Sequence, residues 1–290
     1  SSNIYDLGDQ FQHSQYPHHL QLTSSISRNP NERDLALSAI STNHRQHISS
    51  HILDLRRPPQ LNVESGPISD SVGDNNKSSE YSQEMRQAAF LALAALASSQ
   101  ETIRKKIFET CAIMQHLIRG LSENEHKTLK SVLTCLLSLS RSVQQLRTSF
   151  AENSVYTALK GLLNFPSDDI LILVLAVLCN ISLDFSPGKQ QFLDSATIGT
   201  LCDLTNGNDQ FLKLHAMWIL MNMVYQLKDQ NLKFQIFRSL GPDHVLNILE
   251  TETHEELLLK TLGFLRNLLS QKPHIDAIMN NHGEQIMKSL

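Results

Sequence analysis

Several features that define common classes of protein are scarce or missing in this sequence of 290 residues. Its four cysteines form no Cys-x-x-Cys pair and no Cys/His cluster, so nothing supports a metal site or a disulfide framework. The longest apolar run, from Ile170 to Cys179, is too short to span a bilayer, and the first residues carry no signal-peptide pattern. Lys and Arg (25) are outnumbered by Asp and Glu (29), which argues against a nucleic-acid-binding surface. We therefore expect no metal, cofactor, membrane or nucleic acid as a partner.

The cysteines also indicate a cellular compartment. Cys111, Cys135, Cys179 and Cys202 each lie in an apolar, helical pattern, where a free cysteine packs as a small hydrophobic residue. Such reduced structural thiols are typical of compartments that keep thiols reduced. We therefore expect a cytoplasmic and nuclear protein.

Composition divides the sequence near residue 82. Residues 1–82 are rich in serine, histidine and proline and have few regular apolar periods, which predicts a largely disordered, low-complexity segment. The histidines there are irregularly spaced, so we interpret them as solvated and not as metal ligands. From residue 83 onward apolar residues recur at helical spacing, and residues 83–290 are predicted to be all-α.

A repeat of about 42 residues runs through this second part. Its frame falls on Ser138, Asn180, Asn222 and Asn267, which are 42, 42 and 45 residues apart. A period of this length with wholly helical units is typical of armadillo and HEAT repeats. The sequence ends at Leu290 inside such a unit, so we expect the solenoid to be truncated within its last repeat.

Turn and capping residues divide each unit into three helices, which favours armadillo repeats over the two-helix HEAT unit. Ser122–Glu125 and Thr253–Glu256 resemble capping boxes placed before third helices. We therefore predict a right-handed armadillo α-solenoid. The helices predicted for two successive units are 187–193, 195–205, 210–226, 230–240 and 244–250, followed by a long helix to residue 270.

Polar side chains recur once per repeat on the third helices, and we interpret them as the lining of a groove that binds an extended peptide. Trp218, Asn222 and Tyr225 stand at i, i+4 and i+7, which places them on one helical face if the helix continues through all three. The alternative is that the asparagines join neighbouring helices and that Trp218 belongs to the core. The predicted groove residues are Ser138, Arg141, Asn180, Trp218, Asn222, Tyr225, Arg266 and Asn267.

The run Trp218-x-Leu220-x-Asn222 resembles the W-x-L-x-N signature of armadillo repeats, in which Trp and Asn line the concave face. The pattern departs from that of nuclear-import adaptors, because the Trp position holds Thr134, Ala176 and Gly263 in the other units. Receptors for basic cargo would also need acidic groove residues, whereas Arg141 and Arg266 occupy this groove.

Longer runs, such as LSRSVQQLRTSF (139–150) and LLKTLGFLRNLLS (258–270), resemble the armadillo scaffold subunits of the CTLH (GID) ubiquitin ligase over residues 83–290. The resemblance implies a non-enzymatic scaffold. It further implies that N-terminal repeats dock to core subunits of the ligase, while C-terminal repeats hold a substrate receptor in the concave groove for proteasomal degradation of its substrates. By the same resemblance, Trp218 and Tyr225 grip the receptor.

Two other classes of function compete with this one. An enzyme is disfavoured because the sequence has no phosphate-binding glycine loop and no GxSxG motif, and His254-Glu255-x-x-Leu258 lacks the second histidine of a metalloprotease. An armadillo adaptor of cargo or signalling proteins, acting outside any ligase, would share the peptide groove but not the long matching runs.

Overall fold

The computed structural model describes residues 75–110, 112–142, 150, 155–183, 188–269 and 272–289, which lie in one unit of the chain, residues 71–290. Within these ranges every regular element is a helix. The predicted low-complexity segment lies outside the described residues as far as residue 74, and helix α3 (Asn75–Ala97) begins before the predicted boundary at residue 82. None of the described helices is long and apolar enough to cross a membrane.

The helices follow a repeating order of first, second and third helix. First helices are α4 (Glu101–Thr110), α10 (Gly188–Gln191), α13 (Gln230–Leu240) and α16 (Lys272–Ser289). Second helices are α5 (Ile113–Leu121), α8 (Val155–Gly161) with the 3-10 turn η2 (Leu162–Asn164), α11 (Ser195–Thr205) and α14 (Pro242–Thr251). Third helices are α3, α6 (His126–Leu139), α9 (Asp168–Ile181), α12 (Gln210–Val224) and α15 (Glu255–Leu268).

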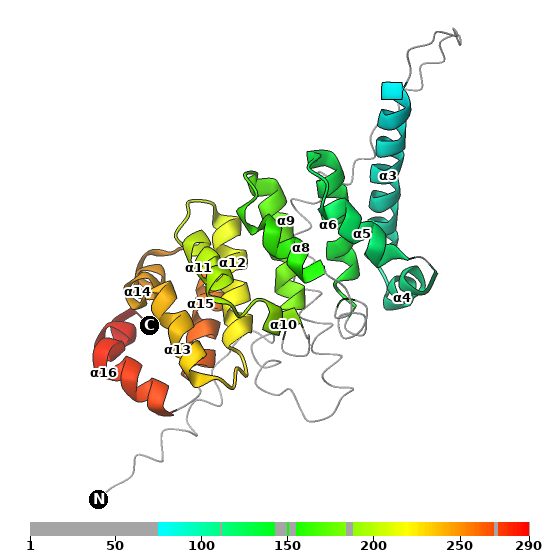
Figure 1. The fold of residues 1–290 in the computed structure, drawn as a ribbon. Helices are drawn as coiled ribbons and strands as arrows, with labels where there is room; N and C mark the ends of the chain where they lie inside the picture. The colour runs from blue at the N-terminus through cyan, green and yellow to red at the C-terminus, as the bar shows by residue number, and fades with distance from the viewer. Residues whose placement is uncertain are drawn as a thin grey trace, which may run out of the picture. The chain divides into compact units, whose positions relative to one another are not determined.

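The third helices pack against one another in sequence, α3 on α6, α6 on α9, α9 on α12 and α12 on α15 (Figure 1). We call this series the third-helix row. Second helices α5, α11 and α14 pack against the third helix of their own unit, and α5 and α11 also contact the next unit through α8 and α13. The predicted all-α armadillo solenoid is thus confirmed.

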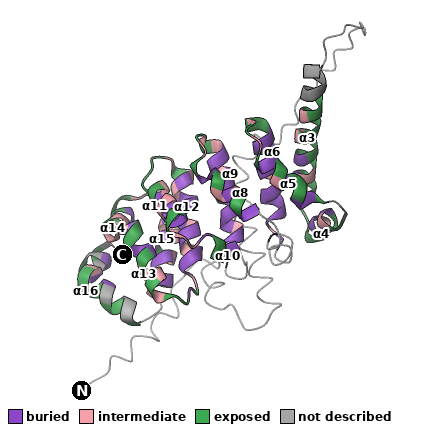
Figure 2. Ribbon diagram, in the orientation of Figure 1, coloured by how far each residue is buried: buried purple, intermediate pink, exposed green. Residues whose placement is uncertain are grey.

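Helix α9 shows why the longest apolar run of the sequence sits where it does. It has third helices on both sides, and from Ile170 to Ile181 only Ile172 and Asn180 are not buried (Figure 2). A helix that is apolar all round is stable only when it is covered all round. Each leucine or valine fully buried here contributes about 1.5–3 kcal/mol relative to an exposed one.

The ends of the helices are fixed by side chains that accept bonds from free backbone N–H groups. Asp194, Asp209 and Asp229 cap α11, α12 and α13 in this way, and Gly241, whose φ of 88° suits glycine, precedes Pro242 at the start of α14. The predicted helices 195–205 and 230–240 match α11 and α13.

Two predicted capping boxes are wrong in their cap residue. The N-cap of α6 is Glu125 and not Ser122, because the Glu125 carboxylate accepts from the N–H groups of Lys127 (3.0 Å) and Thr128 (2.5 Å). In α15 the ring of His254 accepts from a backbone N–H at 3.3 Å. Helix α15 nevertheless begins inside its predicted segment, and α6 begins directly after its own.

Candidate partner-binding surface on the third helices

All eight predicted groove residues lie on or directly after third helices, so the structure places them along one row. They differ in how far solvent reaches them. Ser138, Asn222 and Asn267 are buried, Arg141, Asn180, Trp218 and Tyr225 are half-buried, and Arg266 is exposed.

The three asparagines of the repeat frame share one contact pattern. In each case the side-chain Nδ2 donates to the C-terminal end of the preceding third helix or to the residue just after it. The bonds run from Asn180 to Ser140 Oγ (2.9 Å), from Asn222 to Cys179 O (3.1 Å) and Ser182 Oγ (3.2 Å), and from Asn267 to Met221 O (3.1 Å). We call these contacts the asparagine ladder. They are the inter-helix contacts of the alternative interpretation, in which the asparagines join neighbouring repeats.

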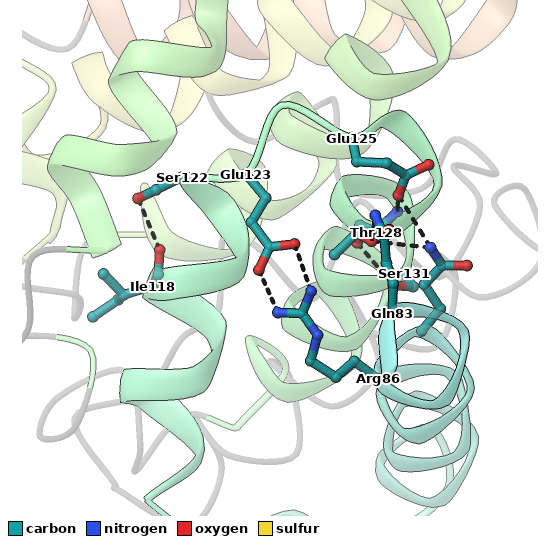
Figure 3. Close-up of polar contacts among 9 residues, drawn as sticks. Gln83, Arg86, Ile118, Ser122, Glu123, Glu125, Thr128 and Ser131 are labelled. Atoms are coloured by element: carbon teal, nitrogen blue, oxygen red, sulfur yellow. Dashed lines mark hydrogen bonds and ion pairs between the residues drawn. The ribbon is translucent and has the colours of Figure 1, made fainter. Parts of the chain in front are cut away.

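At the junction between α3 and α6 the frame residue is Ser138, which has no amide to donate. Here Arg86 binds Glu123 through two bonds of 2.6 and 3.2 Å (Figure 3). Gln87 donates to Glu125 and Thr128, both at 3.0 Å. These contacts lie at the start of α6, at the opposite end from the ladder. Polar bonds thus fix the register of neighbouring repeats even where the ladder is missing.

Trp218 lies half-buried on α12 and carries a cation on its ring. The Lys260 ammonium of α15 is 3.7 Å from the ring centroid, a cation–π contact between adjacent third helices. Burial lowers the pKa of Lys260, and the nearby carboxylate of Glu256 acts in the opposite direction. Sequence patterns did not reveal Lys260, because its contact partner is in another repeat.

The Trp position of the next repeat lies against Met221 of α12. Gly263 holds the Trp position of α15, and a Cβ atom there would come within 2.6 Å of Met221 Sδ. Met221 belongs to α12 and also accepts the ladder bond of Asn267 through its carbonyl. A side chain at residue 263 would therefore require the Met221 side chain to move.

Tyr225 departs from the predicted geometry. Helix α12 ends at Val224, and Tyr225 has extended backbone angles (φ −64°, ψ 126°), so the i, i+4, i+7 relation to Trp218 stops short of it. The Lys189 ammonium donates to the Tyr225 carbonyl, and the tyrosine hydroxyl accepts from the side chain of Gln226 at 3.0 Å. Both aromatic side chains still belong to the same repeat of the third-helix row.

Metal-binding clusters and cysteine thiols are two kinds of reactive group that could give the described residues a chemical activity. They contain no group of three or more His, Cys, Asp or Glu side chains that could hold a metal ion. Cys135, Cys179 and Cys202 are free and buried, as expected for structural thiols, and Cys111 lies outside the described residues. Burial raises the pKa of Cys135 and Cys202 to about 12 and raises that of Cys179 as well, which keeps the thiols protonated.

Comparison with solved structures supports the fold. An engineered protein covers 71% of the chain with a TM-score of 0.62 at 19% identity, and 83% of that protein is matched. A designed armadillo repeat protein, solved in complex with the peptide (KR)4, covers 86% of the chain with a TM-score of 0.55 at 16% identity, and 98% of it is matched. Together with the stacked three-helix units, these likenesses define the chain as an armadillo-repeat solenoid.

Sequence comparison identifies the family within that class, although no family model matches the chain. Over 211 residues, 73% of the chain, it is 46% identical to armadillo repeat-containing protein 8 of Danio rerio and 44% identical to that of Mus musculus. Over this stretch the chain belongs to the armadillo repeat-containing protein 8 family. It is also 29% identical over 218 residues to GID complex subunit 5 of Schizosaccharomyces pombe. The chain spans about a third of the length of these curated relatives.

Proposed function

We propose that the chain is a non-catalytic scaffold of a CTLH/GID-type ubiquitin ligase, in which the third-helix row holds a substrate receptor as an extended segment. The family supports the ligase, because one relative is named as a subunit of the GID complex. The relatives' remaining length would include the repeats that dock to core subunits of the ligase. The free, buried cysteines support a cytoplasmic and nuclear location.

The observation that carries the receptor-holding role is the position of Trp218. It is a half-buried tryptophan on the row of third helices, in the same repeat as the half-buried Tyr225, and large aromatic side chains in such positions are the usual anchors of an interface. A designed armadillo protein of the same fold has been solved with a peptide bound, which supports an extended segment as the occupant.

The asparagine ladder restricts how this segment would bind. The Nδ2 atoms of Asn180, Asn222 and Asn267 already donate within the solenoid. In our proposal, therefore, the aromatic side chains and the basic residues Arg141 and Arg266 make the main contacts to the receptor. The buried asparagines set the spacing of the repeats that present them.

The proposal is tested by affinity purification of the full-length protein with identification of its stable partners. We expect a receptor subunit and the core subunits of the ligase to co-purify in fixed proportions. Recovery of import receptors or adhesion-type cytoplasmic tails, without ligase subunits, would contradict the proposal and favour an armadillo adaptor that acts outside any ligase.

A further inference from the structure

Lys260 is an unusual charge for the middle of a stacked helix. It lies on α15 with its ammonium on the face of the Trp218 ring of α12, 3.7 Å from the centroid. An ammonium on a tryptophan face is held by the quadrupole of the ring, most strongly where water is partly excluded. Burial is the main reason that the pKa of Lys260 is lowered, so water is partly excluded here.

In the part of the chain that the structure describes, Lys260 has no close anion. Among the described residues, no carboxylate lies within the 4.0 Å of an ion pair with the Lys260 ammonium. Glu256, one turn earlier on α15, acts on Lys260 only through its longer-range field, and the raised pKa of the Cys179 thiol keeps it uncharged. A partly desolvated ammonium that lies on an aromatic face gains from binding a carboxylate.

Two arginines also lie along the third-helix row. Arg266 is exposed on α15 close to the ladder residue Asn267, and its guanidinium lies 3.4 Å from the Asn267 side-chain oxygen. Arg141 follows α6 further along the row. Glu255 and Glu256, both in the first turn of α15, oppose this charge. The Lys260 ammonium is therefore matched to a carboxylate of the partner and not to a basic side chain such as those of the (KR)4 peptide of the designed protein.

We propose that Lys260, held on the ring of Trp218, binds a carboxylate of the segment that occupies the third-helix row. That carboxylate is either an Asp or Glu side chain or the end of the partner's chain. This inference rests on the proposed function and specifies the chemistry of the partner. Trp218 then has two parts in binding, because its edge contacts the segment while its face positions the lysine.

The experiment compares receptor binding by the wild-type protein with that of Lys260→Met, which keeps the apolar stem and removes the charge. The matched control is Arg238→Met, which removes a cation that lies 4.7 Å above the Phe234 ring on the first helix α13. We expect Lys260→Met to weaken binding about tenfold or more and to reduce its dependence on salt. Arg238→Met and the charge-preserving Lys260→Arg should bind within about threefold of the wild type.

The source of the carboxylate is found with synthetic peptides that tile the receptor sequence. Each is made with a free or an amidated C-terminus, and with Asp and Glu replaced by Asn and Gln. If the carboxylate is the end of the partner's chain, amidation should remove the difference in affinity between the wild-type protein and Lys260→Met. If it is a side chain, the replacement of Asp and Glu should remove that difference.

Unchanged affinity of a folded Lys260→Met would overturn the carboxylate site, and tighter binding would show instead that Lys260 competes with the partner for Trp218. In both cases the proposed function would survive if Trp218→Ala with Tyr225→Ala still weakened binding. A wild-type protein that binds no receptor would overturn both proposals.

Discussion

Asn222 illustrates why sequence alone leaves two interpretations of a single residue open. A polar residue at the same place in every repeat is equally compatible with a binding groove and with a contact between repeats, because both recur with the period of the solenoid. The choice depends on whether the side chain faces solvent or the preceding helix. Asn222 is buried and donates to two acceptors of the preceding repeat, which only the register of α12 on α9 could reveal.

Asn222→Ala is expected to destabilise the protein by about 1–3 kcal/mol, because it removes two hydrogen bonds and leaves the Cys179 carbonyl without this donor. Urea denaturation followed by circular dichroism measures the loss. Asn180→Ala is the control, since Asn180 is half-buried and makes one such bond. A loss no larger than that of the control would show that the second bond and the deeper burial contribute nothing.

The buried thiols give a second prediction at this scale. Because burial raises the pKa of Cys135 and Cys202 to about 12 and raises that of Cys179, almost no thiolate is present at pH 8. A maleimide or disulfide reagent should label all three slowly in the native protein and completely in denaturant. Rapid native labelling of Cys179 would place its side chain on the surface and contradict the packing of α9.

At the scale of the helix, the sequence predicts positions better than ends. Third helices were placed correctly because their apolar periodicity extends over several turns. Their caps were not, since Glu125 and His254 are uncommon N-cap residues. Helix α12 stops before Tyr225, and Gln226 adopts a positive φ of 49°, with no glycine or proline nearby to signal the end.

The cap of α11 makes a pH-dependent prediction. Asp194 accepts from the backbone N–H (3.0 Å) and hydroxyl (2.8 Å) of Thr197 and from Lys160 (2.6 Å). Partial burial acts to raise the pKa of Asp194, but these bonds lower it to about 2. Since the unfolded pKa is about 3.9, the ionised cap stabilises the protein above about pH 4, and this contribution is lost as the pH falls toward 2.

Asp194→Ala should therefore cost about 1 kcal/mol of unfolding free energy at pH 7, and the difference from the wild type should shrink between about pH 4 and pH 2. Urea titrations at several pH values measure this. Asp203→Ala, an exposed change on the same helix that removes no cap, serves as the control. A difference that stays constant down to pH 2 would contradict the cap.

At the scale of the whole molecule, the period near 42 residues was sufficient to predict the stacked solenoid, because every repeat buries its apolar faces against its neighbours in the same way. The contacts specific to one junction could not be predicted. Lys260 on Trp218 and Met221 against Gly263 each join residues about one repeat apart, and no local pattern links such pairs.

One measurement decides whether Trp218 and Tyr225 bind the receptor or belong to the core of the solenoid. It is the affinity of the receptor for the double variant Trp218→Ala with Tyr225→Ala, measured together with a melting curve of the same variant. If both side chains contact the receptor, binding should weaken at least about thirtyfold while the melting temperature stays close to that of the wild type. Phe234→Ala, which removes an aromatic ring from the first helix α13, should bind normally. A stable double variant with unchanged affinity, or one whose helical signal and melting temperature fall together with binding, would contradict a receptor site on the third-helix row.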